Sequence, residues 1–129
     1  MTKRFSGLEI DEFAGEGRHT LTLGGELDIA SAPTLHAAIS RTLERASARD
    51  AIVLDLSGLM FIDSTGLAEI ILTSQLCDRD GHSFALIAGP RAVQRMFELT
   101  GLTNALPFVE APADVQRGLR AADTGNAIT

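Results

Sequence analysis

The chain has 129 residues, a hydrophobic fraction of 45% and a formal net charge of −6, which fits one globular domain with a sizeable core. Its acidic balance and its lack of Trp and Tyr argue against a nucleic-acid partner, because phosphate backbones repel negative charge. The single cysteine, Cys77, excludes an internal disulfide and is expected to be a buried, unreactive thiol.

Segments that target or anchor a protein are not expected. Residues 1–5 are not followed by an apolar run, so they do not form a signal peptide. The longest apolar stretches are far short of the ~20 residues that span a bilayer. We therefore expect a soluble cytoplasmic protein without a membrane partner.

The first part of the chain predicts a β-hairpin followed by a helix. Residues 5–13 and 18–24 alternate loosely between apolar and polar side chains, and residues 14–17 (Ala-Gly-Glu-Gly) suit a turn between them. Residues 31–33 (Ser-Ala-Pro) open a helix, because serine suits its cap and proline its first turn. Apolar side chains of this helix recur every three or four residues: Leu35, Ile39, Leu43 and Ala46.

The middle of the chain alternates strands and helices. Residues 51–56 form a continuous apolar run that is too short for a helix and is typical of a central strand covered on both faces. We expect a helix over residues 65–79, a strand over residues 83–88 and a third helix that begins at residues 89–90. Gly101 is a natural stop for that helix.

The C-terminal part adds smaller elements. Residues 106–109 suit a short edge strand, Val115 and Leu119 indicate a last helix, and residues 121–129 are expected to form a flexible tail. The complete pattern predicts a single α/β domain over residues 1–120, with a mixed sheet opened by a β-hairpin and about four helices packed on it. The loop expected between Asp55 and Ser64 then lies beyond the carboxyl ends of the strands, where such sheets bind ligands.

Signatures of catalysis are missing. Ser64 lies in Ile-Asp-Ser-Thr-Gly (residues 62–66), which does not match the nucleophile elbow of hydrolases, and Lys3, the only lysine, cannot complete a P-loop. We predict no enzymatic activity, no cofactor and no metal, with a weak magnesium site between Asp28 and Asp63 as the alternative left open. The three histidines lack metal-ligand spacing and are expected to be solvated: His19, His36 and His82.

Ser64 lies at the expected start of helix 65–79. A helix N-terminus has unpaired N–H groups and partial positive charge, so it tolerates a phosphate well. The residues allow Ser64 to be a plain helix cap or the site of a phosphorylation switch that leaves the fold intact. Gly66 indicates either close approach of another backbone or a partner, or freedom at the start of the helix. The wide apolar arc of the helix indicates either packing by a second helix or a partner surface at its Ser64 end.

Two segments resemble the signature of the STAS domain family, and more particularly the bacterial anti-sigma-factor antagonists. Residues 54–58 (Leu-Asp-Leu-Ser-Gly) are followed by residues 61–67 (Phe-Ile-Asp-Ser-Thr-Gly-Leu). Residues 25–35 (Gly-Glu-Leu-Asp-Ile-Ala-Ser-Ala-Pro-Thr-Leu) resemble the family's Gly-Glu-Leu-Asp segment that leads into its first helix. The resemblance extends over residues 5–120 and implies a STAS-like fold.

The resemblance implies a partner-switching module. In this family the unphosphorylated antagonist binds an anti-sigma factor, itself a serine kinase, and thereby frees a sigma factor. The kinase phosphorylates the motif serine, here Ser64, which releases the antagonist, and a PP2C-type phosphatase restores it. Thr65 is a secondary candidate for phosphorylation. The expected partner surface consists of Asp28, Met60, Asp63, Ser64, Thr65, Gly66 and Leu67.

Members of the family also serve in other assemblies. STAS domains are subunits of lipid or anion transport systems and parts of sensory scaffolds, so such a role is the alternative to an antagonist. A small hydrolase that uses Ser64 is a third hypothesis.

Overall fold

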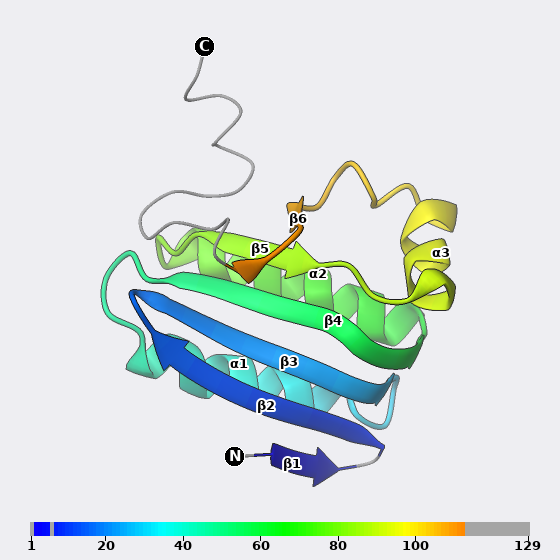
Figure 1. Ribbon diagram of the computed structural model, residues 1–129, viewed down its shortest axis with the longest axis horizontal. Coiled ribbons are helices and arrows are strands. Elements are labelled where there is room, and N and C mark those ends of the chain that lie inside the picture. The colour runs from blue at the N-terminus through cyan, green and yellow to red at the C-terminus, as the bar shows by residue number, and fades with distance from the viewer. Residues whose placement is uncertain (1, 6, 113–129) are drawn as a thin grey trace.

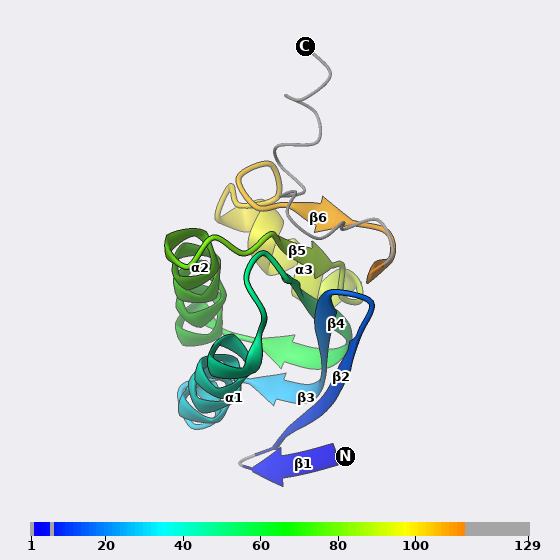
Figure 2. The ribbon, with the colours of Figure 1, turned by 90° about the vertical axis from the view of Figure 1, so that its left-hand side faces the viewer.

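A six-stranded mixed sheet carries helices α1 and α2 side by side on one face (Figures 1 and 2). The computed structural model describes residues 2–5 and 7–112. The strands of this part are β1 (Thr2–Phe5), β2 (Leu8–Gly15), β3 (Arg18–Leu27), β4 (Ala51–Ile62), β5 (Phe84–Ile87) and β6 (Phe108–Val109). Its helices are α1 (Ala32–Arg45), α2 (Ser64–Arg79) and α3 (Arg91–Leu99).

The strands lie in chain order across the sheet. β1, β2 and β3 pair antiparallel, whereas β3, β4, β5 and β6 pair parallel. The turn between β2 and β3 has positive φ at Glu16 (57°) and Gly17 (76°), which is the two-residue turn whose twist matches a hairpin. The expected opening hairpin is therefore confirmed.

The main core lies between the sheet and the helices. Alternate residues of each central strand point into it, as Leu21 and Leu23 do from β3 and Leu54 and Leu56 do from β4, and all four are at most 1% exposed. From α3, Phe97 is fully buried in the same cluster. A smaller cluster on the second face of the sheet consists of Ala51, Val53 and Ala85, with Ile87 and Val109 packed against it.

The fold class is confirmed, with differences in its elements. The described residues contain three helices rather than about four, and the helix expected around Val115 and Leu119 falls outside them, as do residues 121–129. The strand expected over residues 51–56 continues to Ile62, because the ladder with β3 extends from Thr22↔Asp55 to Leu27↔Ile62 across two register shifts. Most of the expected loop is therefore strand. No helix within the described residues is long and apolar enough to cross a membrane.

A buried polar network contradicts one expectation about the histidines. Asp50, 6% exposed, accepts a hydrogen bond from the Ser47 N–H (2.9 Å), and its Oδ2 lies 3.0 Å from His19 Nε2. His82 Nδ1 lies 2.8 Å from the Asp50 carbonyl oxygen. Half-buried His19 and buried His82 are therefore structural rather than solvated, while His36 is exposed on α1 as expected.

Candidate functional site

The carboxyl ends of β3 and β4 bring the two predicted acidic residues to one edge of the sheet. Leu27 of β3 is in register with Ile62 of β4, and the Asp63 N–H donates to the Leu27 carbonyl oxygen at 3.2 Å. Asp28 and Asp63 directly follow these paired residues. The sequence therefore positions the starts of α1 and α2 next to each other.

Ser64 is the first residue of α2, and Asp63 is the residue that caps the helix. The Asp63 Oδ1 accepts a hydrogen bond from the Gly66 N–H at 2.9 Å, and its carbonyl oxygen accepts one from the Leu67 N–H at 2.9 Å. Ser64 is exposed, and its hydroxyl has no hydrogen-bond partner within residues 2–5 and 7–112. The interpretation of Ser64 as the helix cap is thus wrong, and its hydroxyl is available to a partner.

Gly66 allows the first turn of α2 to approach β3. A Cβ at this position would lie 2.5 Å from the Leu27 carbonyl oxygen and 2.9 Å from Cγ1 of Ile62. Real Cβ atoms do not come this close to other atoms. Of the two explanations for Gly66, the structure supports close approach of another backbone.

The Asp28 carboxylate organises the loop between β3 and α1. Its Oδ1 accepts hydrogen bonds from the Ala30 N–H (3.0 Å) and the Ser31 N–H (3.1 Å). The buried Ser31 hydroxyl donates to the Glu26 carbonyl oxygen at 2.8 Å. Since Asp28 and Asp63 each bind backbone N–H groups, a magnesium ion would have to compete with these bonds. The described residues contain no group of three or more metal-binding side chains.

Two other predicted residues, Leu67 and Thr65, are less exposed than Ser64. Leu67 is 4% exposed and belongs to the core. Thr65 is half-buried and lies one turn before Glu69, whose Oε1 lies 2.8 Å from Nδ1 of His36 on α1. Because α1 packs beside α2 (Figure 2), a neighbouring helix accounts for the wide apolar arc.

Three exposed apolar side chains lie in the segments next to Asp28 and Ser64: Ile29 directly follows Asp28, and Met60 and Phe61 precede Ser64 by four and three residues. Ile29 is 74% exposed, Met60 77% and Phe61 49%, and we call these three residues the apolar rim. Exposed apolar side chains next to polar ones are typical of interaction sites. The predicted partner surface included Met60 but neither Phe61 nor Ile29. The sequence did contain a signal for Ile29. It is an apolar residue between Asp28 and the predicted start of the next helix, outside the apolar pattern of the neighbouring strand and helix.

The far end of α2 has different chemistry. The thiol of Cys77 is fully buried, and its burial, reinforced by the charge of Asp80, raises its pKa to about 12. A thiol in this state is unreactive, which agrees with the expectation for Cys77.

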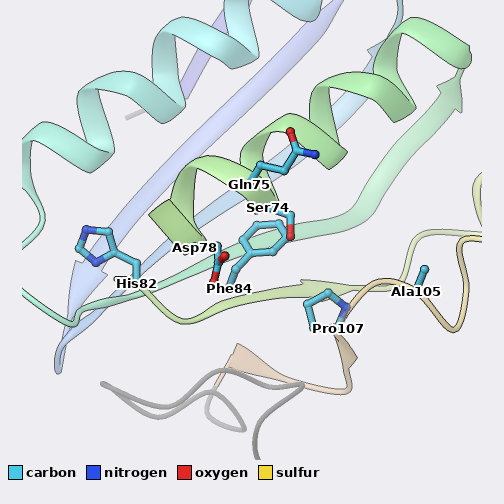
Figure 3. Close-up of a pocket in the computed structure, with 7 residues that line it drawn as sticks. All are labelled: Ser74, Gln75, Asp78, His82, Phe84, Ala105 and Pro107. Atoms are coloured by element: carbon cyan, nitrogen blue, oxygen red, sulfur yellow. The ribbon is translucent and has the colours of Figure 1, made fainter. Parts of the chain in front are cut away.

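A cavity of about 240 Å³ lies at the same end of α2, between α2, Phe84 and Pro107 (Figure 3). None of the predicted site residues lines it.

Comparison with known proteins identifies the family. A family model described as "Mlab, STAS domain" matches residues 13–110. The chain belongs to the STAS domain family. This STAS domain is 31% identical over 106 residues to the anti-sigma-F factor antagonist RsfB of Mycobacterium tuberculosis, covering 81% of the chain and 83% of RsfB. It is 26% identical over 97 residues to the anti-sigma-B factor antagonist of Staphylococcus aureus, covering 75% of the chain and 88% of the relative.

A solved structure gives the same assignment. The STAS domain superimposes on an anti-sigma factor antagonist from Mycobacterium paratuberculosis with a TM-score of 0.71 and 27% sequence identity, covering 83% of this chain and 89% of that one.

Proposed function

We propose that this chain is an anti-sigma-factor antagonist whose unphosphorylated form binds an anti-sigma factor, and that phosphorylation of Ser64 ends this binding. The anti-sigma factor is proposed to be the serine kinase that modifies Ser64, and a PP2C-type phosphatase to reverse the modification. The chain itself acts by binding, not catalysis, in the cytoplasm where sigma factors work. The naming of its relatives as antagonists supports the choice of partner.

One observation carries the switch: the Ser64 hydroxyl is exposed, has no partner among the described residues, and directly follows the capping residue Asp63, three residues after the exposed Phe61 of the apolar rim. Phosphorylation adds roughly −1.5 to −2 charges. In the free protein this charge lies in water at a helix N-terminus, which tolerates it. In a complex, the charge would have to be buried beside apolar side chains, and a loss of about 3 kcal/mol weakens binding more than a hundredfold.

The test is affinity capture from host lysate with four baits: phosphatase-treated wild type, Ser64→Ala, Ser64→Glu and Thr103→Glu. The last is a matched control, because Thr103 is exposed in the segment between α3 and β6 and receives the same charge. We expect wild type, Ser64→Ala and Thr103→Glu to retain a small ATP-binding kinase that Ser64→Glu loses.

Two other outcomes would identify the alternatives. Retention of the same transport or scaffold proteins by all four baits would show that Ser64 does not control binding and that the chain is an assembly subunit. Covalent labelling of Ser64 by a serine-reactive phosphonate would instead support a hydrolase.

A further inference from the structure

The loop between β3 and α1 is a tight turn that presents one apolar side chain to solvent. The turn extends from Asp28 to Ser31, and the Ser31 N–H donates to the Asp28 carbonyl oxygen at 3.2 Å. Its first position favours Asp, whose carboxylate can bind N–H groups within the turn. Ile29 and Ala30 are its central residues. Ile29 is 74% exposed and belongs to neither core cluster.

Hydrogen bonds hold this turn in place from both of its ends. At one end, the Asp28 Oδ1 accepts bonds from the Ala30 N–H (3.0 Å) and the Ser31 N–H (3.1 Å). At the other end, the fully buried Ser31 hydroxyl accepts a bond from the Asp28 N–H (2.9 Å) and donates one to the Glu26 carbonyl oxygen (2.8 Å). The backbone at Ile29 is therefore fixed before any partner arrives, and a loop that is already ordered loses less entropy on binding.

The turn and Ser64 are close enough for one partner to cover both. The loops that lead into α1 and α2 lie at the same end of the sheet (Figure 1). Ile29 is two residues beyond Leu27, and Ser64 is two residues beyond Ile62, which pairs with Leu27. Paired strands lie about 4.8 Å apart and each residue spans at most about 3.6 Å, so the Cα atoms of Ile29 and Ser64 are at most about 20 Å apart. One side of a typical protein interface covers about 800 Å², which corresponds to a patch about 30 Å across.

We infer that Ile29 is an anchor residue that inserts into an apolar pocket of the anti-sigma factor and that Asp28 positions it there, an inference that rests on the proposed function because the partner is the one that Ser64 controls. Side chains that fill a desolvated pocket carry most of the binding energy of an interface. Ile29 then sets the affinity of the complex, whereas Ser64 sets its dependence on phosphorylation. Asp28 acts on the partner through the turn rather than through its charge.

The test uses the anti-sigma factor that wild type captures from lysate, purified and titrated with the full chain in a calorimeter. Ile29→Val removes one carbon atom from the pocket and Ile29→Ala removes three. At the usual stabilisation for each buried methylene, the two variants should weaken binding about fourfold and about fiftyfold. Because Ile29 is exposed in the free chain, both variants should keep the wild-type midpoint in urea.

Phe13→Ala is the matched control for loss of an exposed apolar side chain. Phe13 is 72% exposed. It lies at the other end of β3 and β4, since it pairs with Thr20 and Thr20 pairs with Val53. Although this variant removes a larger side chain than Ile29→Ala does, it should change the affinity less than about twofold.

Two variants of Asp28 test its positioning role. Asp28→Asn removes the charge but keeps an oxygen that can accept the Ala30 and Ser31 N–H groups, so it should weaken binding less than about threefold. Asp28→Ala removes the acceptor and should weaken binding about tenfold, because the turn must then be ordered by the partner. Hydrogen exchange at the Ala30 and Ser31 amides should become faster in Asp28→Ala and stay unchanged in Asp28→Asn.

Each part of the assignment has an outcome that overturns it. Ile29→Ala that binds within about twofold of wild type, while Ser64→Glu still loses the partner, would exclude Ile29 as the anchor and leave the proposed function standing. Equal losses from Asp28→Asn and Asp28→Ala would show that the partner contacts the charge of Asp28 directly. A wild-type dimer in sedimentation that Ile29→Ala dissociates would assign the turn to a second copy of this chain instead. Failure of wild type to capture any anti-sigma factor would overturn the proposed function and the role of Ile29 together.

Discussion

Replacing Gly66 by Ala tests whether close contact or helix propensity governs the start of α2. Helix propensity alone predicts a higher free energy of unfolding, since Ala is more favourable than Gly in a helix by about 1 kcal/mol. The structure predicts a loss, because the new methyl group would lie 2.5 Å from the Leu27 carbonyl oxygen and 2.9 Å from Leu27 Cγ and from Ile62 Cγ1. The two effects have opposite signs, so one substitution distinguishes them.

The magnitude follows from what must move. Overpacking costs typically about 1–3 kcal/mol. The upper end applies here, because the shortest contact is with a backbone carbonyl of β3, which cannot rotate away as a side chain could. Subtracting the propensity gain of about 1 kcal/mol leaves a net loss of about 2 kcal/mol in the free energy of unfolding.

Urea unfolding followed by circular dichroism measures this loss as a lower midpoint at unchanged slope. Ala68→Gly is the matched control, since Ala68 is exposed on the same helix and should lose only the propensity difference of about 1 kcal/mol. A Gly66→Ala protein as stable as wild type, or more stable, would refute the close-contact argument.

Three further substitutions test other parts of the structure. Asp63→Ala removes the cap of α2 and should lower the free energy of unfolding by about 1 kcal/mol, with faster hydrogen exchange at the Gly66 amide; unchanged exchange there would contradict the assignment of the cap. Asp50→Ala removes a buried carboxylate that binds the Ser47 N–H and lies against half-buried His19, and it should cost about 2 kcal/mol in urea unfolding. A loss below about 1 kcal/mol would show that water replaces the carboxylate. Cys77 should resist thiol reagents at pH 8 in the folded chain and react fully in urea, since burial raises its pKa from 9.0 to about 12. As pH rises, the thiol ionises in the unfolded chain before it ionises in the folded one. The contribution of Cys77 to the free energy of unfolding is therefore complete below the unfolded pKa of 9.0 and is lost as pH rises toward about 12. Cys77→Ala should lack this decrease of the free energy of unfolding with pH.

The sequence was sufficient for the order of elements from β2 to β6, but it did not predict β1 or the length of β4. The apolar run ends at Leu56, and Ser57-Gly58 has the composition of a turn. The strand nevertheless continues, because Gly24 and Gly58 face each other and let β3 and β4 stay in contact. Which residues pair across strands depends on tertiary structure. The local pattern of one segment does not contain this information.

The same limit applies to the site. The motif indicated Ser64, but only the backbone geometry shows that Asp63 caps the helix. The wide apolar arc of α2 could not be assigned from the sequence, because the position of α1 was not known. The expectation for His82 was wrong for a similar reason: the hydrogen-bond partner of its ring, the Asp50 carbonyl oxygen, is 32 residues away in the chain.

Asp63, not Ser64, caps α2, so a modification of Ser64 would leave the capping bond of the fold intact. If Ser64 were the cap, modifying its hydroxyl would remove a bond that holds the start of α2. Asp63 makes that bond instead, through Gly66, and the tight fit of Gly66 against β3 fixes the helix independently. A phosphate on Ser64 would gain about 0.3–1 kcal/mol from the helix dipole and lose a similar amount to repulsion by Asp63. The free energy of folding is thus nearly insensitive to the modification, and its effect falls on any partner that covers Ser64.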